Sequence, residues 1–323
     1  MQVWGTILTI DAMTGPPKAL IGPVLGAIAA VAIWGASPFA TAIAGRSIPP
    51  ELIAGLRTML AAAILLPFVV KFRHAFPVGW SGRLELIVGA VFGFAIYPLV
   101  LSVGVLQTSA THASIILAAA PIFTGLLTFS ITRKWPKGLW WIGSLVAICG
   151  VVTLMAWRGQ AQVGKSATMW GDMLVLVSVF CASVGYVYGG RSAARIGQWP
   201  ATTWSIAIGA LVFAPFAVPG LWRFDWSMTA PADICALLFL VVFVTVAGYA
   251  LWFQALAKVG AERIAPLQFL QPFVGAALAT IWLREALSTG VVAAMALILF
   301  GVWLTRKAQT ASPRVPSAAD KQL

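Results

Sequence analysis

Residues 111–150 read THASIILAAAPIFTGLLTFSITRKWPKGLWWIGSLVAICG, and residues 262–301 read ERIAPLQFLQPFVGAALATIWLREALSTGVVAAMALILFG. Aligned without a gap, the two stretches repeat identical residues 151 positions apart, at Pro121 and Pro272, Arg133 and Arg284, and Gly150 and Gly301. This constant shift indicates that the second half of the chain is a copy of the first. The duplication decides the fold, because both halves of the chain must then adopt the structure of the same repeated unit.

The composition favours a lipid bilayer as the environment of the chain. Hydrophobic residues occupy 60% of the 323 positions and charged residues only 9%, whereas a soluble domain carries about 25% charged residues. The cysteines Cys149, Cys181 and Cys235 stand singly in apolar runs, without the spacing of metal or redox sites. We therefore expect an integral membrane protein that uses no metal and no cofactor.

Ten stretches are apolar over about the 20 residues that a membrane-spanning helix needs. Each copy of the repeat holds five of them, and an odd number of crossings inserts the second copy upside down relative to the first. The prediction is an all-α integral membrane protein whose ten transmembrane helices form two inverted five-helix repeats. The predicted spans are 19–44, 50–71, 82–105, 111–132, 138–157, 169–192, 200–221, 232–256, 262–283 and 287–306.

The same pattern predicts the division of the chain. Five parts are expected: a cytoplasmic N-terminal segment (1–18), the first repeat (19–157), a linker (158–168), the second repeat (169–306) and a disordered cytoplasmic tail (307–323).

Lysine and arginine are distributed unequally between the two sides. Fifteen fall in segments on the side of the N-terminus, five fall on the opposite side, and Arg57 lies within a span. Short cytoplasmic loops are rich in these residues, so both termini are expected in the cytoplasm. The net charge of +12 follows from this bias and suits anionic lipid headgroups. No nucleic-acid partner is expected.

Short motifs in both halves carry a family resemblance. The second half has YALWFQAL from Tyr249, GAER from Gly260, LQPF from Leu270 and WLRE from Trp282; the first has WGAS from Trp34, PP from Pro49, SATHA from Ser109 and APIF from Ala120. In order and spacing the chain resembles drug/metabolite transporters of the EamA branch over most of residues 19–306. One departure is Arg133-Lys134, where the family often has Gly-Glu; the basic pair suits a cytoplasmic loop.

The resemblance implies a ten-helix carrier and not an enzyme. Such carriers move small organic metabolites, commonly exporting amino acids or related compounds across a bacterial inner membrane. Spans 1–4 and 6–9 surround a central cavity, and spans 5 and 10 lie outside it. The expected partners are a small-molecule substrate and the lipid bilayer, and a homo-oligomer is left open.

The positions of the acidic residues limit the class of substrate that can be expected. None of them falls at the middle of a predicted span, and a proton-coupled exporter of cationic drugs needs a buried carboxylate. A neutral or zwitterionic metabolite is therefore expected. The alternatives are an efflux carrier for drugs or nucleotide-sugar-like compounds, and beyond transporters a membrane enzyme or a scaffold.

Aromatic, amide and hydroxyl side chains deep in the spans are the main candidates for substrate contacts. Tyr and Trp can instead anchor at the membrane interface, and Gln can simply bond a neighbouring helix. The candidates are Trp34, Ser37, Tyr97, Tyr186, Tyr249, Trp252, Gln268 and Gln271.

Three basic residues add to this set. His112 and Arg263 are equivalent in the repeat and could be gate or substrate-carboxylate contacts, or merely an interfacial His and a positive-inside Arg. Arg57 either faces the cavity, bridges helices or extends to the surface. Pro121 and Pro272 break equivalent helices, so they and Arg263 are the candidates for gating.

Glycine pairs at four-residue spacing are expected to let helices approach closely. These pairs are Gly22/Gly26, Gly89/Gly93 and Gly185/Gly189.

Overall fold

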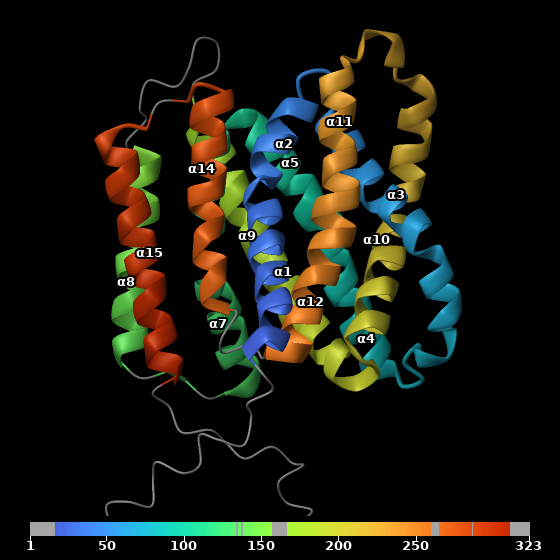
Figure 1. The fold of residues 1–323 in the computed structure, drawn as a ribbon, viewed down its shortest axis with the longest axis horizontal. Coiled ribbons are helices and arrows are strands. Elements are labelled where there is room, and N and C mark those ends of the chain that lie inside the picture. The colour runs from blue at the N-terminus through green and yellow to red at the C-terminus, as the bar shows by residue number, and fades with distance from the viewer. Residues whose placement is uncertain are drawn as a thin grey trace, which may run out of the picture.

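A computed structural model of the chain describes residues 17–133, 135–136, 138–156, 167–259, 265–285 and 287–310. Within these ranges the regular structure is entirely helical (Figure 1). Nine described helices are long and apolar enough to cross a membrane, and the shorter apolar helix Leu267–Trp282 takes the position of the remaining span. The predicted ten-helix membrane architecture is therefore confirmed.

The first repeat contains five spans, three of which are assembled from more than one helical segment. Its elements are α1 (Pro17–Gly35) and α2 (Ser37–Ala44) in span 1, α3 (Pro50–Lys71) in span 2, α4 (Trp80–Ala90), η3 (Val91–Ile96) and α5 (Tyr97–Gln107) in span 3, α6 (Ala110–Leu117) and α7 (Ala120–Thr132) in span 4, and α8 (Gly138–Ala156) in span 5.

The second repeat follows the same order, with continuous helices in spans 6, 7 and 10. Its elements are α9 (Met169–Ile196), α10 (Gln198–Arg223), α11 (Pro231–Phe239) with η5 (Leu240–Ala247) and α12 (Gly248–Val259) in span 8, η6 (Ala265–Leu270) with α14 (Gln271–Trp282) in span 9, and α15 (Thr289–Thr310).

The two ends of the molecule are distinguished by the course of the chain. We call the end where α1 begins and α15 ends the termini face, and the end where α8 ends and α9 begins the linker face; they are the lower and upper ends of Figure 1. Each repeat has five spans, so equivalent loops of the two copies lie at opposite faces, as the inverted duplication requires.

Backbone details recur at equivalent positions of the two copies. The η3 and η5 segments are π-helical and end at Ile96 and Ala247, which are equivalent in the repeat. Arg133 and Arg284, equivalent as well, have φ of 57° and 56° and are the described non-glycine residues with positive φ. Left-handed conformations are uncommon outside glycine, so this coincidence reflects the duplication and not chance.

Spans 1, 4 and 9 are interrupted within their length. The segments after the breaks, α2, α7 and α14, carry a proline in their first two positions. A proline is tolerated there because the first helical N–H groups have no partner within the helix. Pro121 and Pro272 therefore begin the second part of a broken span.

Close helix contacts explain part of the glycine pattern. A Cβ atom on Gly185 of α9 would lie 2.6 Å from Cα of Gly93 in η3, whereas a Cβ atom on Gly189 would meet nothing within 4 Å. Below this contact, the buried carboxylate of Glu85 in α4 pairs with Arg191 and Arg195 of α9 at 2.6 and 2.7 Å. Span 3 and α9 are thus joined tightly.

The pair formed by α8 and α15 lies at one edge of the molecule (Figure 1). Its two helices approach through glycines, because a Cβ atom on Gly143 would lie 2.6 Å from the carbonyl oxygen of Gly301. Their contacts with the other spans are few and run mainly to α6 and α7. The middle of the molecule is therefore formed by the remaining eight spans.

Candidate functional site

Two of the predicted residues, Trp34 and Arg57, donate hydrogen bonds to the π-helical segment η5 of span 8. Nε1 of Trp34 in α1 donates to the carbonyl oxygen of Val244 at 3.0 Å. Oγ1 of Thr245 donates to the carbonyl oxygen of Leu240 at 2.9 Å and accepts a hydrogen bond from Nε of Arg57 at 2.9 Å. Segments of this kind occur often at functional sites, and here the segment binds side chains from spans 1 and 2.

Arg57 is buried, with 8% of its surface exposed. Its guanidinium group bridges α3 and η5 through Thr245, so the side chain does not extend to the membrane surface. Tyr97 of α5, Tyr186 of α9 and Tyr249 of α12 lie within electrostatic range of it. The structure therefore gathers four predicted residues from four spans.

Aromatic rings continue from this group toward the termini face. The ring of Tyr249 lies 5.3 Å from that of Trp34 and 5.7 Å from that of Phe253, and Trp34 lies 5.4 Å from Trp252, measured between centroids. Phe253 in turn contacts Trp199 of α10 at 6.4 Å. These contacts lead step by step from the interior to the start of α10.

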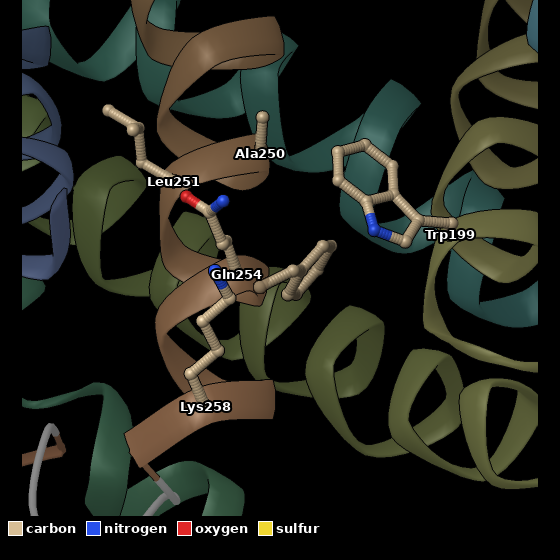
Figure 2. A pocket seen from close by; sticks show the side chains of 6 residues that line it. Trp199, Ala250, Leu251, Gln254 and Lys258 are labelled. Atoms are coloured by element: carbon tan, nitrogen blue, oxygen red, sulfur yellow. The ribbon is translucent and has the colours of Figure 1, made fainter. Parts of the chain in front are cut away.

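A pocket of about 350 Å³ lies at the end of this aromatic series. Figure 2 shows Trp199 of α10 on one side and residues of α12 on the other. Because α10 begins and α12 ends at the termini face, the pocket lies close to that face. The lining residues are Trp199, Ala250, Leu251, Phe253, Gln254 and Lys258.

None of these lining residues was among the substrate contacts predicted from the sequence. A signal was present, because Ala250, Phe253 and Gln254 follow one another at helical spacing in the stretch that begins at Tyr249. Trp199 and α12 are far apart in the sequence, so the sequence does not indicate that they lie side by side in the structure.

At the linker face, hydrogen bonds tie the two repeats together. Asp172 of α9 is 2% exposed, accepts a hydrogen bond from Oγ1 of Thr108 and lies 3.0 Å from Nδ1 of His112 in α6. His112 is thus held at this face, and no contact joins it to the described group around Arg57.

The carboxylate of Glu285 makes a second tie at this face. Its Oε1 and Oε2 atoms accept hydrogen bonds from the backbone N–H groups of Ala110 and Thr111 at 2.9 and 2.8 Å. These groups begin α6, and a helix N-terminus favours negative charge. Glu285, which follows α14, therefore holds span 9 against span 4.

The comparisons with known proteins agree with this architecture. The model of the EamA-like transporter family matches residues 21–156 and again residues 169–307. The chain belongs to the EamA-like transporter family. Its membership confirms the resemblance seen in the sequence motifs and makes the protein a multi-pass membrane transporter.

Relatives of this EamA protein cover nearly its whole length. It is 26% identical to the uncharacterized transporter YetK of Bacillus subtilis (strain 168), over 95% of this chain and 93% of that protein. It is 28% identical to a probable amino-acid metabolite efflux pump of Escherichia coli (strain K12), over 86% and 92%. A solved crystal structure shares the fold, with a TM-score of 0.58 at 19% identity over 90% of this chain and 99% of the other.

The remaining predicted residues of the EamA chain lie apart from Arg57. Ser37 begins α2 at the break of span 1, where its hydroxyl is buried without a hydrogen bond to another described residue. Gln271 begins α14 and its carbonyl oxygen lies against Gly35, while Oε1 of Gln268 accepts a hydrogen bond from Arg306 of α15 at 3.2 Å. Arg263 lies outside the described residues.

Among the described residues, no three His, Cys, Asp or Glu side chains are grouped so that they could hold a metal ion.

Replacing Trp34 by Phe tests the hydrogen bond to η5. The variant keeps an aromatic ring against Tyr249 but removes the donor to the Val244 carbonyl. We expect the free energy of unfolding to fall by about 1–2 kcal/mol, measured as a lower unfolding midpoint of purified protein in detergent. Trp199→Phe is the matched control, because the Trp199 indole lines the pocket and donates to no described residue. Equal midpoints for the two variants would contradict this account.

Proposed function

We propose that the protein is a secondary transporter that moves a small neutral or zwitterionic metabolite, an amino acid or a related compound, by alternating access. The observation that carries the proposal is the asymmetry between the faces. A pocket lies at the termini face, and a series of aromatic ring contacts runs from it to Tyr249, while Asp172 and Glu285 tie the repeats together at the linker face. A binding group accessible from one side is what alternating access requires.

The helix breaks support movement around this group. Gly35, at the end of α1, contacts Gln271 at the start of α14, so the breaks of spans 1 and 9 meet. Ser114 of α6 contacts Gly275 of α14 nearby. Broken helices can turn at such points without breaking a continuous hydrogen-bond ladder.

We propose that the direction is export across the bacterial inner membrane. The described basic residues of the loops gather at the termini face, and by the positive-inside rule this supports a cytoplasmic termini face. The pocket at the termini face would accept its cargo from the cytoplasm. The amino-acid metabolite efflux pump among the relatives is consistent with this direction.

The runner-up is an efflux carrier for drugs or nucleotide-sugar-like compounds. A cationic drug would need a free carboxylate in the interior. The buried described carboxylates are instead held by Arg191 and Arg195, by His112, by Ser47 and by the start of α6. This distribution favours a cargo that is not a cation.

Counterflow in liposomes tests the proposed function. Purified protein is reconstituted with an unlabelled internal amino acid, and uptake of the labelled compound is followed across a panel of amino acids and related metabolites. We expect transient accumulation of at least one zwitterion above the level in protein-free liposomes. Movement of a cationic dye without exchange of any zwitterion would overturn the proposal.

A further inference from the structure

We propose that Arg57 binds the carboxylate of the cargo and that the site does not require an amino group. The carrier would then accept the anions of apolar or aromatic carboxylic acids in addition to the zwitterionic amino acids of the proposed function. This inference rests on the proposed transport function and names the substrate class of the same site.

The first argument is the missing counter-charge of Arg57. Among the six described acidic residues none lies within 4.0 Å of the guanidinium group. Five of them, Glu85, Asp172, Asp225, Asp233 and Glu285, are bonded to other partners, and Glu51 is exposed at the start of α3. A buried charge without a partner is unfavourable by several kcal/mol, so an anion that enters here is stabilised by an existing positive charge.

The second argument is the supply of hydrogen-bond donors. Nε of Arg57 is held by Thr245, and no hydrogen bond joins its two terminal nitrogens to another described residue. A guanidinium group fixed through Nε still offers the pair of parallel donors that fits a carboxylate. Tyr97, Tyr186 and Tyr249 lie within electrostatic range of the guanidinium group, and their hydroxyl groups are hydrogen-bond donors. Tyr186 is 50% exposed, so half of its side chain is not covered by other residues.

The third argument concerns the rest of the cargo. Beyond Tyr249, toward the termini face, most of the walls are aromatic or aliphatic: Trp34, Phe94 and Phe253 contact Tyr249, and Leu251 and Trp199 line the pocket. Gln254 and Lys258 are the polar residues of the pocket lining. These surfaces suit an apolar or aromatic side chain. In the described residues no carboxylate lines these walls, so an ammonium group would find no negative counter-charge there.

The charge beside the pocket also favours an anionic cargo. Lys258 is exposed at the rim of the pocket, on the termini face (Figure 2). A positive charge at the mouth of a cleft raises the local concentration of anions. Entrance and binding group thus both favour a carboxylate.

Three compounds that share a phenyl ring distinguish the contribution of the carboxylate from that of the ammonium group. They are 3-phenylpropanoate (carboxylate only), L-phenylalanine (both groups) and 2-phenylethylamine (ammonium only). Each is tested as an inhibitor of counterflow of a cargo that the wild-type protein exchanges. We expect the two carboxylates to inhibit within about tenfold of one another, and the amine to be at least about tenfold weaker than either.

Variants of Arg57 then test the residue. Arg57→Gln should weaken inhibition by both carboxylates by about 10- to 100-fold, while the weak inhibition by the amine stays unchanged. Arg57→Lys should restore part of the loss, because it keeps the charge without the paired donors. Arg46→Gln is the control, since it removes a positive charge from an exposed position at the linker face.

The outcomes separate this inference from the proposed function. If no compound is exchanged by the wild-type protein, the transport function fails. If exchange occurs but the amine inhibits as well as the acids, only the role of Arg57 in carboxylate binding fails. The same conclusion follows if Arg57→Gln weakens all three inhibitors alike and lowers the unfolding midpoint, which is the result expected of a purely structural bridge.

Discussion

Gly185→Ala should destabilise the folded protein by about 3 kcal/mol, although the change adds only a single methyl group. The new Cβ atom would lie 2.6 Å from Cα and 3.0 Å from N of Gly93, both of them backbone atoms. No side-chain rotation relieves such a contact, so span 3 and α9 would have to separate. The unfolding midpoint in detergent measures the effect.

The matched control lies one turn further along the same helix. Gly189→Ala places its Cβ atom in open space, and an alanine in a helix is favoured over glycine by up to about 1 kcal/mol. We expect its midpoint to be unchanged or slightly raised. Midpoints that fall equally in both variants would show that helix propensity or insertion, and not the contact with Gly93, governs the result.

Glu285→Ala should open the linker face. The change removes both acceptors from the first N–H groups of α6, and a charge-assisted pair of this kind contributes about 2–3 kcal/mol. Span 9 would lose its hold on span 4, so the population with an open linker face should rise. Transport that depends on resealing this face should slow.

The opening can be measured with a reporter cysteine at Thr111. Thr111 is 2% exposed and its hydroxyl has no described partner, so Thr111→Cys is a mild change. In a background without the native cysteines, Glu285→Ala should speed reaction of this thiol with a water-soluble maleimide by at least about tenfold. Glu51→Ala is the control, because its carboxylate is exposed at the same face. Equal labelling rates in the Glu285→Ala and Glu51→Ala variants would show that Glu285 does not keep the linker face closed.

The architecture could be predicted from the sequence because two strong signals agree. Long apolar stretches mark the spans, and the shift of 151 positions marks the duplication. Pro121 and Pro272 also indicated the breaks of spans 4 and 9. The break of span 1 was not predicted, because the residues around Ala36 remain mostly apolar and hydropathy does not mark it. The π-helical segments leave no sequence signal of their own.

The sequence indicated which residues could belong to the candidate site, but it did not indicate which residues they would contact. Arg57 stood out as a charge at membrane depth, but Thr245, its hydrogen-bond partner, lies 188 positions away. His112 was equally conspicuous, yet its partner Asp172 belongs to the other repeat. Such pairs are set by tertiary contacts, which a single sequence does not reveal.

The residues that follow the left-handed arginines at the ends of α7 and α14 make the two faces of the molecule unequal. Arg133 and Arg284 share this backbone conformation, and the residues that follow them are Lys134 and Glu285. A carboxylate accepts hydrogen bonds from a helix N-terminus, whereas an ammonium group has no lone pair to offer. Two inverted copies of identical sequence would populate inward and outward forms equally. Under the proposed alternating access, this difference between Lys134 and Glu285 is one that favours a closed linker face at rest.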